Sequence, residues 1–153
     1  MTVTLLFILS NLILMTSSYP FGSPACVGQP KHGGEPQKDR ENLAVEFSKE
    51  KNTDGAFIVR MTASDESFTL KGFLVITNSP GQFVAGQGVA LLACTGALGS
   101  AGPEYKAVTH TDSSEKQVVE IEFVPENPDL EEEPEFEIVI LRNYHTFWTE
   151  IVV

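Results

Sequence analysis

The chain has 153 residues, and its 21 acidic and 10 basic side chains give a formal net charge of −11. A protein with a pI near 4.6 lacks the basic surface that binds nucleic acid or anionic lipid by electrostatic attraction. Its two cysteines are too few for a disulfide-rich miniprotein or for a structural zinc site made of four cysteines.

The N-terminus carries an apolar run at residues 5–15, broken only by Ser10 and Asn11. A membrane-spanning helix needs about 20 apolar residues, so this run is too short to cross a bilayer. Its length and the small residues that follow at 16–18 are typical of a secretory signal peptide, although no lysine or arginine precedes it. We therefore expect residues 1–18 to be removed and residues 19–153 to form one secreted domain without membrane insertion. The alternative is a buried N-terminal strand or helix.

Residues 19–42 are rich in Pro, Gly, Lys, Glu and Gln and show no periodicity, which predicts an irregular lead-in anchored by Cys26. In an oxidising compartment, Cys26 and Cys94 are expected to form a disulfide. The bond would close a loop of 69 residues, counting both ends, and would stabilise the fold by roughly 4 kcal/mol. The alternative is a catalytic thiol, which would need an unpaired cysteine and an activating base.

After the lead-in, short apolar runs alternate with turn signals. Turns are expected at residues 52–55 and 78–81, where Asn, Pro and Gly favour tight reversals of the chain. The apolar runs lie near residues 43–47, 56–61, 68–70, 73–77, 89–94, 119–123, 136–140 and 147–153.

No helix-length window shows a 3.6-residue periodicity, and the spacing of the runs suggests about seven to nine short strands. Hydrophobic residues make up 42% of the chain, which is enough for a sizeable core. We therefore predict an all-β fold, an antiparallel β-sandwich, with Trp148 in the core or at a sheet edge.

An acidic segment at residues 126–135 carries six carboxylates. Calcium prefers oxygen ligands and is a possible cofactor here, but the segment lacks the glycine and the ligand spacing of an EF-hand loop. Its two prolines favour an extended, solvated loop, and calcium binding is the alternative.

Nothing in the sequence indicates a catalytic centre. His32, His110 and His145 lie at no local metal-ligand spacing from one another, and no Gly-x-Ser-x-Gly motif is present. Surface or hydrogen-bonding roles are therefore expected for the histidines, and apart from calcium no cofactor is expected.

Several short stretches occur together in a characteristic order. They are YPFGSPAC at 19–26, PKHG at 30–33, GFLV at 72–75, VTHT at 108–111 after Cys94, and NYHTFW at 143–148. Together they resemble the reeler domain, a module of reelin and F-spondin, over essentially all of residues 19–153. The resemblance implies an immunoglobulin-like sandwich. One departure lies after Pro125, where a tryptophan-bearing segment is expected and Phe123-Val124-Pro125-Glu126-Asn127 is found instead, so no contact of that aromatic is carried over.

Stand-alone reeler proteins of this length are similar to insect haemolymph defence proteins, including those that promote haemocyte nodulation. The resemblance implies a non-catalytic antibacterial role in innate immunity, through binding to bacterial surface glycans, lipopolysaccharide or haemocytes. The alternative is an extracellular adhesion or matrix module without an immune role. Ferric-chelate reductase relatives add a haem-binding membrane region, and because nothing in this sequence resembles it, reductase activity is not expected.

The net charge conflicts with direct binding to bacteria, because lipopolysaccharide and teichoic acids are anionic. Attraction would need calcium bridges, a local basic segment or an apolar, sugar-facing groove. Lys31, His32, Lys38 and Arg40 form the local basic cluster and are the predicted ligand contacts. The alternative is that they are scattered charges of the lead-in.

Overall fold

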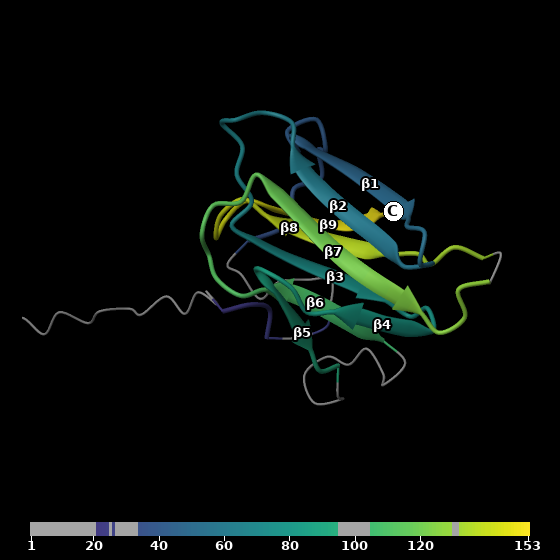
Figure 1. Ribbon diagram of the computed structural model, residues 1–153. Coiled ribbons are helices and arrows are strands. Elements are labelled where there is room, and N and C mark those ends of the chain that lie inside the picture. Colours follow the sequence, from purple (N-terminus) through teal and green to yellow (C-terminus); the bar gives the residue numbers. More distant parts are fainter. Residues whose placement is uncertain (1–20, 25, 27–33, 95–104, 130–131) are drawn as a thin grey trace, which may run out of the picture.

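The computed structural model describes residues 21–24, 26, 34–94, 105–129 and 132–153, which form two antiparallel sheets and no helix (Figure 1). A four-stranded sheet has the order β1-β2-β7-β4, and a five-stranded sheet has the order β5-β6-β3-β8-β9. The strands are β1 (Val45–Lys51), β2 (Phe57–Ala63), β3 (Gly72–Thr77), β4 (Gly81–Val84), β5 (Val89–Leu92), β6 (Lys106–His110), β7 (Val118–Pro125), β8 (Glu137–Leu141) and β9 (Phe147–Val152). The prediction of an all-β antiparallel sandwich is confirmed.

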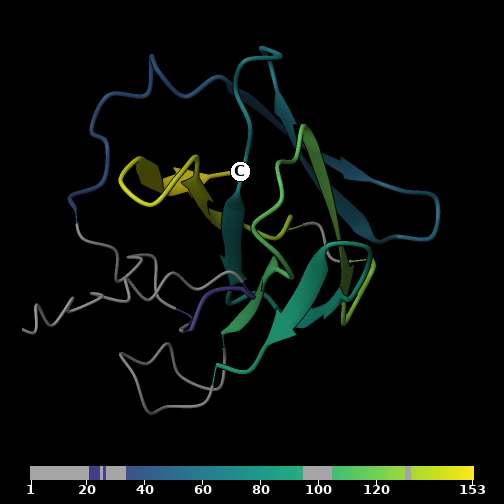
Figure 2. The ribbon, with the colours of Figure 1, turned by 90° about the vertical axis from the view of Figure 1, so that its left-hand side faces the viewer.

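The main core lies between the two sheets, which form separate layers in Figure 2. Three rings meet at its centre: the Phe123 ring lies 5.2 Å from that of Phe83 and 5.4 Å from that of Phe136. Trp148 is also buried, with its ring 5.9 Å from that of Phe68. Trp148 is therefore a core residue, as predicted.

The two sheets differ in how their outer faces are covered. In β7 every second side chain is buried, so one face of the four-stranded sheet meets the core and the other meets solvent. In β3 all six residues are buried, which explains the unbroken apolar run of that strand. Its outward residues Leu74 and Ile76 belong to a second apolar cluster with Ala107, Val139 and Cys26. The outer face of the five-stranded sheet is thus covered by part of the lead-in.

The predicted disulfide joins Cys26 to Cys94, with the two Cα atoms 5.4 Å apart. Cys26 is buried in the second apolar cluster, so the bond attaches the lead-in to the outer face of the five-stranded sheet. The alternative reading of either cysteine as a catalytic thiol is excluded, because both sulfurs are bonded.

The predicted turns occur where expected. At residues 52–55 the Asn52 side-chain oxygen accepts the N–H groups of Asp54 (3.0 Å) and Ala56 (2.9 Å), and Gly55 adopts a φ of +85°. This turn joins β1 to β2 in a hairpin.

Two strands, β4 and β6, were not expected from the sequence, and residues 68–70 contribute only an isolated bridge between Leu70 and Lys116. β4 has four residues and follows a turn directly, which is too short for alternation to be visible. β6 exists because it pairs with β3 and β5, contacts that are distant in sequence.

Candidate functional site

The lead-in runs along the outer edge of β9. The Gln37 N–H donates to the Phe147 C=O (2.8 Å), the Trp148 indole N–H donates to the Asp39 C=O (3.0 Å), and the Arg40 guanidinium donates to the Glu150 C=O (2.6 Å). These bonds cover an edge that would otherwise present unpaired backbone groups. Arg40 thus has a structural role in holding the lead-in on β9.

The predicted basic cluster is only half within the described residues, because Lys31 and His32 lie outside them. Lys38 and Arg40 are exposed. However, three carboxylates share residues 34–42 with these two cations, so this part of the lead-in has a formal charge of 2 − 3 = −1.

The acidic segment is a largely exposed loop, with residues 130 and 131 outside the described part. Lys49 holds it to β1 through an ion pair with Glu133 (3.4 Å) and a hydrogen bond to the Pro134 C=O (3.0 Å). Within the described ranges, no three His, Cys, Asp or Glu side chains gather as metal ligands.

A buried polar network links β3, β6 and the lead-in. The Phe73 N–H donates to His110 Nδ1 (3.1 Å), and the Thr109 hydroxyl donates to the Phe73 C=O (2.8 Å). The Ser23 N–H in turn donates to the Thr109 hydroxyl oxygen (2.9 Å). A Cβ at Gly72 would lie 2.8 Å from His110 Cε1, so a side chain there would displace the imidazole. His110 is therefore a buried structural histidine.

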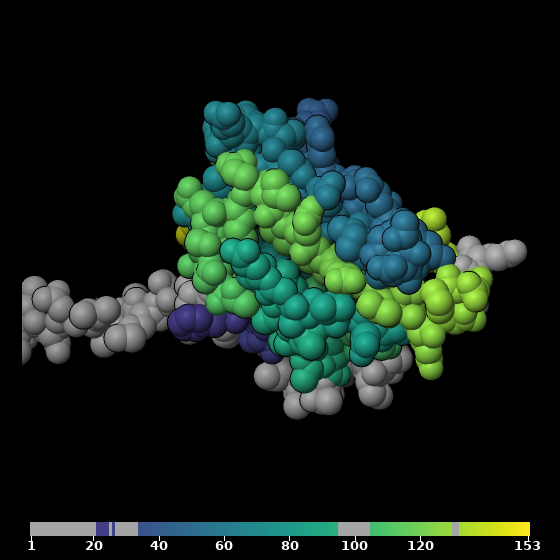
Figure 3. All heavy atoms as spheres, viewed as in Figure 1, coloured from purple at the N-terminus to yellow at the C-terminus, as the bar shows by residue number. Residues whose placement is uncertain are grey.

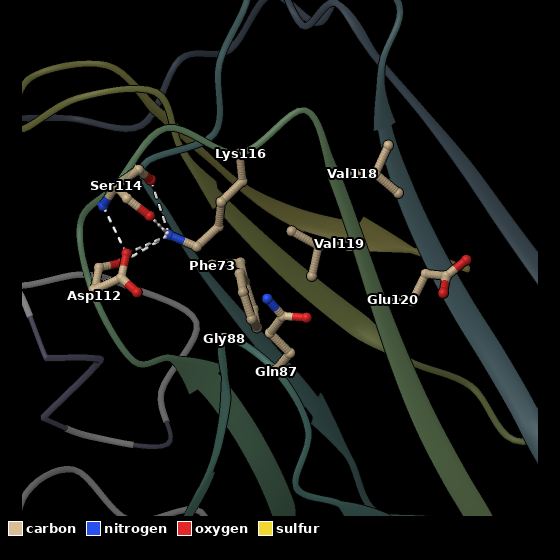
Figure 4. Close-up of a pocket in the computed structure, with 9 residues that line it drawn as sticks. All are labelled: Phe73, Gln87, Gly88, Asp112, Ser114, Lys116, Val118, Val119 and Glu120. Atoms are coloured by element: carbon tan, nitrogen blue, oxygen red, sulfur yellow. Dashed lines mark hydrogen bonds and ion pairs between the residues drawn. The ribbon is translucent and has the colours of Figure 1, made fainter.

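A pocket of about 500 Å³ opens where the two sheets separate, between β7, the β4–β5 turn and the loop that precedes β7. In Figure 4, Phe73 lies between Gln87 and Gly88 on one side and Lys116 on another, with Val119 and Glu120 along β7. On the surface, the green residues of β7 and its preceding loop lie beside the teal residues of β4 and β5 (Figure 3). Sequence reasoning missed this pocket.

Asp112, Ser114 and Lys116 form a fixed rim on this pocket. The Lys116 ammonium donates to Asp112 Oδ1 (3.0 Å), to the Asp112 C=O (2.9 Å) and to the Ser114 C=O (2.8 Å). Its three protons are therefore engaged within the loop, and it is not available to bind an anion. Hydrogen bonds from Ser114, and then from Lys116, hold the pKa of the Asp112 carboxyl well below its ordinary value.

The comparisons with known proteins identify the family. The sequence profile of one family, described as the Reeler domain, matches residues 24–152. The chain belongs to the reeler family. In a comparison with curated protein sequences, nothing matches.

Solved reeler domains share the fold. The crystal structure of the Reelin-N domain of F-spondin matches with a TM-score of 0.50 and 11% identity, over 80% of this chain and 88% of that one. The human F-spondin reeler domain (fragment 1) matches with a TM-score of 0.50 and 10% identity, over 82% of this chain and 93% of that one. At these identities the likeness establishes the fold alone.

The stretches that resembled the reeler domain have structural roles here. GFLV begins the central strand β3, and VTHT contains the buried Thr109 and His110 that bind it. NYHTFW enters β9, which receives the lead-in. The part of this reeler chain that the structure describes contains no helix with the length and apolarity to cross a membrane.

The two aspartates with lowered pKa values predict how stability depends on pH. Backbone and side-chain hydrogen bonds from Ser67 lower the pKa of Asp65, as those from Ser114 and Lys116 lower that of Asp112. The stability that these two carboxylates contribute is fully present above their ordinary pKa of 3.8 and is lost as the pH falls below it.

An Asp65→Asn/Asp112→Asn variant should therefore have a lower melting temperature than the natural protein at neutral pH. The difference in melting temperature, followed by circular dichroism, should shrink towards about pH 2. A constant difference at all pH values would contradict this.

Proposed function

We propose that this protein is a secreted, non-catalytic recognition protein of innate immunity that binds bacterial surface components or haemocytes. The observation that carries the proposal is the reeler match over residues 24–152. Recognition would then be a property of the surface of the domain itself. The apolar run at residues 5–15, as a signal peptide removed after Ser18, supports secretion, and we propose the haemolymph as the compartment.

Charge favours calcium as the bridge to an anionic microbial surface. Residues 31–42 carry the cations Lys31, Lys38 and Arg40 against three carboxylates, a formal charge of 3 − 3 = 0 with histidine neutral, so this segment does not offset the overall −11. Calcium can join carboxylates of the protein to phosphates or carboxylates of a glycan, because it accepts oxygen ligands from both sides. The exposed carboxylates of residues 126–135 are the proposed protein ligands, each supplying a single bridge, because among the described residues no three of them gather into one metal site.

The test is a pull-down of the purified protein on whole bacteria and on haemocytes, with calcium and with EDTA. We expect binding to bacteria to increase with calcium and to fall by at least about tenfold in EDTA. A variant with Glu126, Asp129, Glu132 and Glu133 changed to their amides should lose the calcium response. A matched variant, Glu46→Gln/Glu50→Gln on β1, should keep it.

A further variant and the negative results distinguish the other possible modes of binding and the alternative function. A variant that neutralises Lys31, His32, Lys38 and Arg40 tests the basic segment. If binding is unchanged by EDTA and by this variant, neither route operates. If the protein binds neither bacteria nor haemocytes, and bacterial challenge does not raise its transcript, the role is that of an adhesion or matrix module without immune function.

A further inference from the structure

The β7 strand is longer than the strand that pairs with its outer edge. β4 ends at Val84, which is opposite Glu122, whereas β7 begins at Val118 (Figure 1). The first half of β7 therefore pairs with β2 on one side and with no strand on the other.

The alternation of an antiparallel ladder shows which backbone groups face this open edge. The Ala63 N–H donates to the Gln117 C=O (2.8 Å), so Gln117, Val119 and Ile121 turn their backbone groups towards β2. The backbone N–H and C=O groups of Val118 and Glu120 therefore point away from β2, towards the side that β4 does not reach. Within the described part of the chain, no backbone group pairs with these two N–H and two C=O groups.

The pocket lies directly beside this open edge. Its lining includes Val118, Val119 and Glu120 of β7, with the core residue Phe73 and the turn residues Gln87 and Gly88 (Figure 4). An extended segment placed along the edge would point every second side chain inward, in line with Val119. The pocket, of about 500 Å³, has an apolar part made by Phe73, Val118 and Val119 and a polar rim made by Asp112, Ser114 and Lys116. An inward apolar side chain of the segment would lie against the apolar part.

The negative charge on the outer face of the four-stranded sheet favours basic residues at the outward positions of such a segment. The outward residues of the four-stranded sheet include Glu46, Glu50, Glu120 and Glu122 against one cation, Arg60, a balance of 1 − 4 = −3. Arg60 Nε is already bound to Glu120 Oε1 (2.7 Å). Side chains that point outward beside Glu120 and Glu122 would be stabilised if they were lysine or arginine.

We propose that the open edge of β7 binds an extended peptide segment of a partner protein, with alternating apolar and basic residues, by strand addition. The backbone of the peptide pairs with Val118 and Glu120, and its apolar side chains enter the pocket. Its basic side chains lie opposite Glu120 and diagonal to Glu122, which is itself opposite Val84 of β4. A second copy of this chain is the less favourable occupant, because it would bring the same carboxylates together at the edge. The inference goes beyond the proposed function, because it holds whether or not the protein binds bacteria.

The test uses a synthetic peptide of roughly six residues in which lysine alternates with valine or phenylalanine. Added to the natural protein, it should protect the Val118 and Glu120 amides from hydrogen exchange, as measured by NMR, and leave exposed loop amides such as Asp129 unchanged. A peptide N-methylated on the residues that face β7 should bind at least about tenfold more weakly, because it cannot donate those hydrogen bonds.

Two variants locate the site. Val118→Pro removes an N–H that faces the open edge and leaves the β2 ladder intact, and proline is tolerated at the first residue of a strand. It should weaken peptide binding by about tenfold, whereas Val118→Ala, which keeps the N–H, should not. If Val118→Pro fails to fold, Glu120→Lys/Glu122→Lys gives the same information, because it should weaken binding of the lysine peptide and strengthen that of a glutamate peptide.

Three results would overturn the proposal. The first is absence of peptide binding, or binding without protection of the Val118 and Glu120 amides. The second is protection of these amides that rises with concentration of the free protein, which would assign the edge to a second copy. The third is full protection in the free protein at every concentration, which would mean that the chain itself covers the edge.

Discussion

Replacing Phe123 by alanine should lower the free energy of unfolding by about 3–5 kcal/mol, at the upper end of the range for single substitutions in a core. Phe123 has no exposed surface, and its ring packs against those of Phe83 and Phe136. Alanine would leave a cavity that neighbouring strands of two sheets cannot close without losing their hydrogen bonds. Equilibrium unfolding in urea, followed by circular dichroism, measures the loss.

The matched control is the next residue. Val124→Ala changes a side chain that is 36% exposed on the outer face of the same strand, and its effect should stay within about 0.5 kcal/mol. Phe123→Leu, which retains much of the volume, should fall between the two. If Phe123→Ala is no more destabilising than Val124→Ala, the three rings are not the centre of the core.

Strands that lie between core and solvent could be predicted from the sequence. In β7, Val119, Ile121 and Phe123 alternate with residues that face water, and this alternation is a direct record of burial on one face. β3 could also be predicted, because burial on both faces leaves an unbroken apolar run. The disulfide could be predicted because only two cysteines are present.

Features that depend on strand pairing could not be predicted from local pattern. β6 is held by β3 and β5, and its five residues show no alternation because four of them are buried. The pocket depends on the difference in length between β4 and β7, two strands that become neighbours only after the fold forms. No local signal marks Val118 and Glu120 as residues of an open edge.

The prediction that the basic cluster contacts a ligand was limited in a different way. Lys38 and Arg40 were predicted as ligand contacts from their proximity to Lys31 and His32 in the sequence. In the structure, Arg40 donates to a backbone C=O of β9. Over residues 31–42, three carboxylates balance the cations Lys31, Lys38 and Arg40. Counting both signs of charge along the segment would have indicated this, whereas the contact with β9 required the fold.

Removing the disulfide should be a perturbation of similar size, with a loss of about 4 kcal/mol in the free energy of unfolding for the Cys26→Ser/Cys94→Ser variant. The two cysteines are separated by 68 positions, so the bond restricts a large part of the unfolded chain. Reduction of the natural protein should cause a similar loss, measured by urea unfolding with and without dithiothreitol. The dependence of the free energy on urea should become steeper, because the unfolded chain exposes more surface without the bond.

Loss of the disulfide should also have a local effect on the lead-in. This effect distinguishes attachment of the lead-in to the sheet from restriction of the unfolded chain. Cys26 attaches the lead-in to the second apolar cluster, and the Ser23 N–H donates to the Thr109 hydroxyl oxygen (2.9 Å) beside it. Without the bond, the Ser23 amide should exchange with solvent faster than the amides of β3, because the lead-in can detach while the sheet remains folded. Cys26→Ala/Cys94→Ala serves as the control for the hydroxyl groups that serine introduces. If the Ser23 amide exchanges at the rate of global unfolding in both variants, the lead-in is held by its own contacts, and the bond acts only on the unfolded chain.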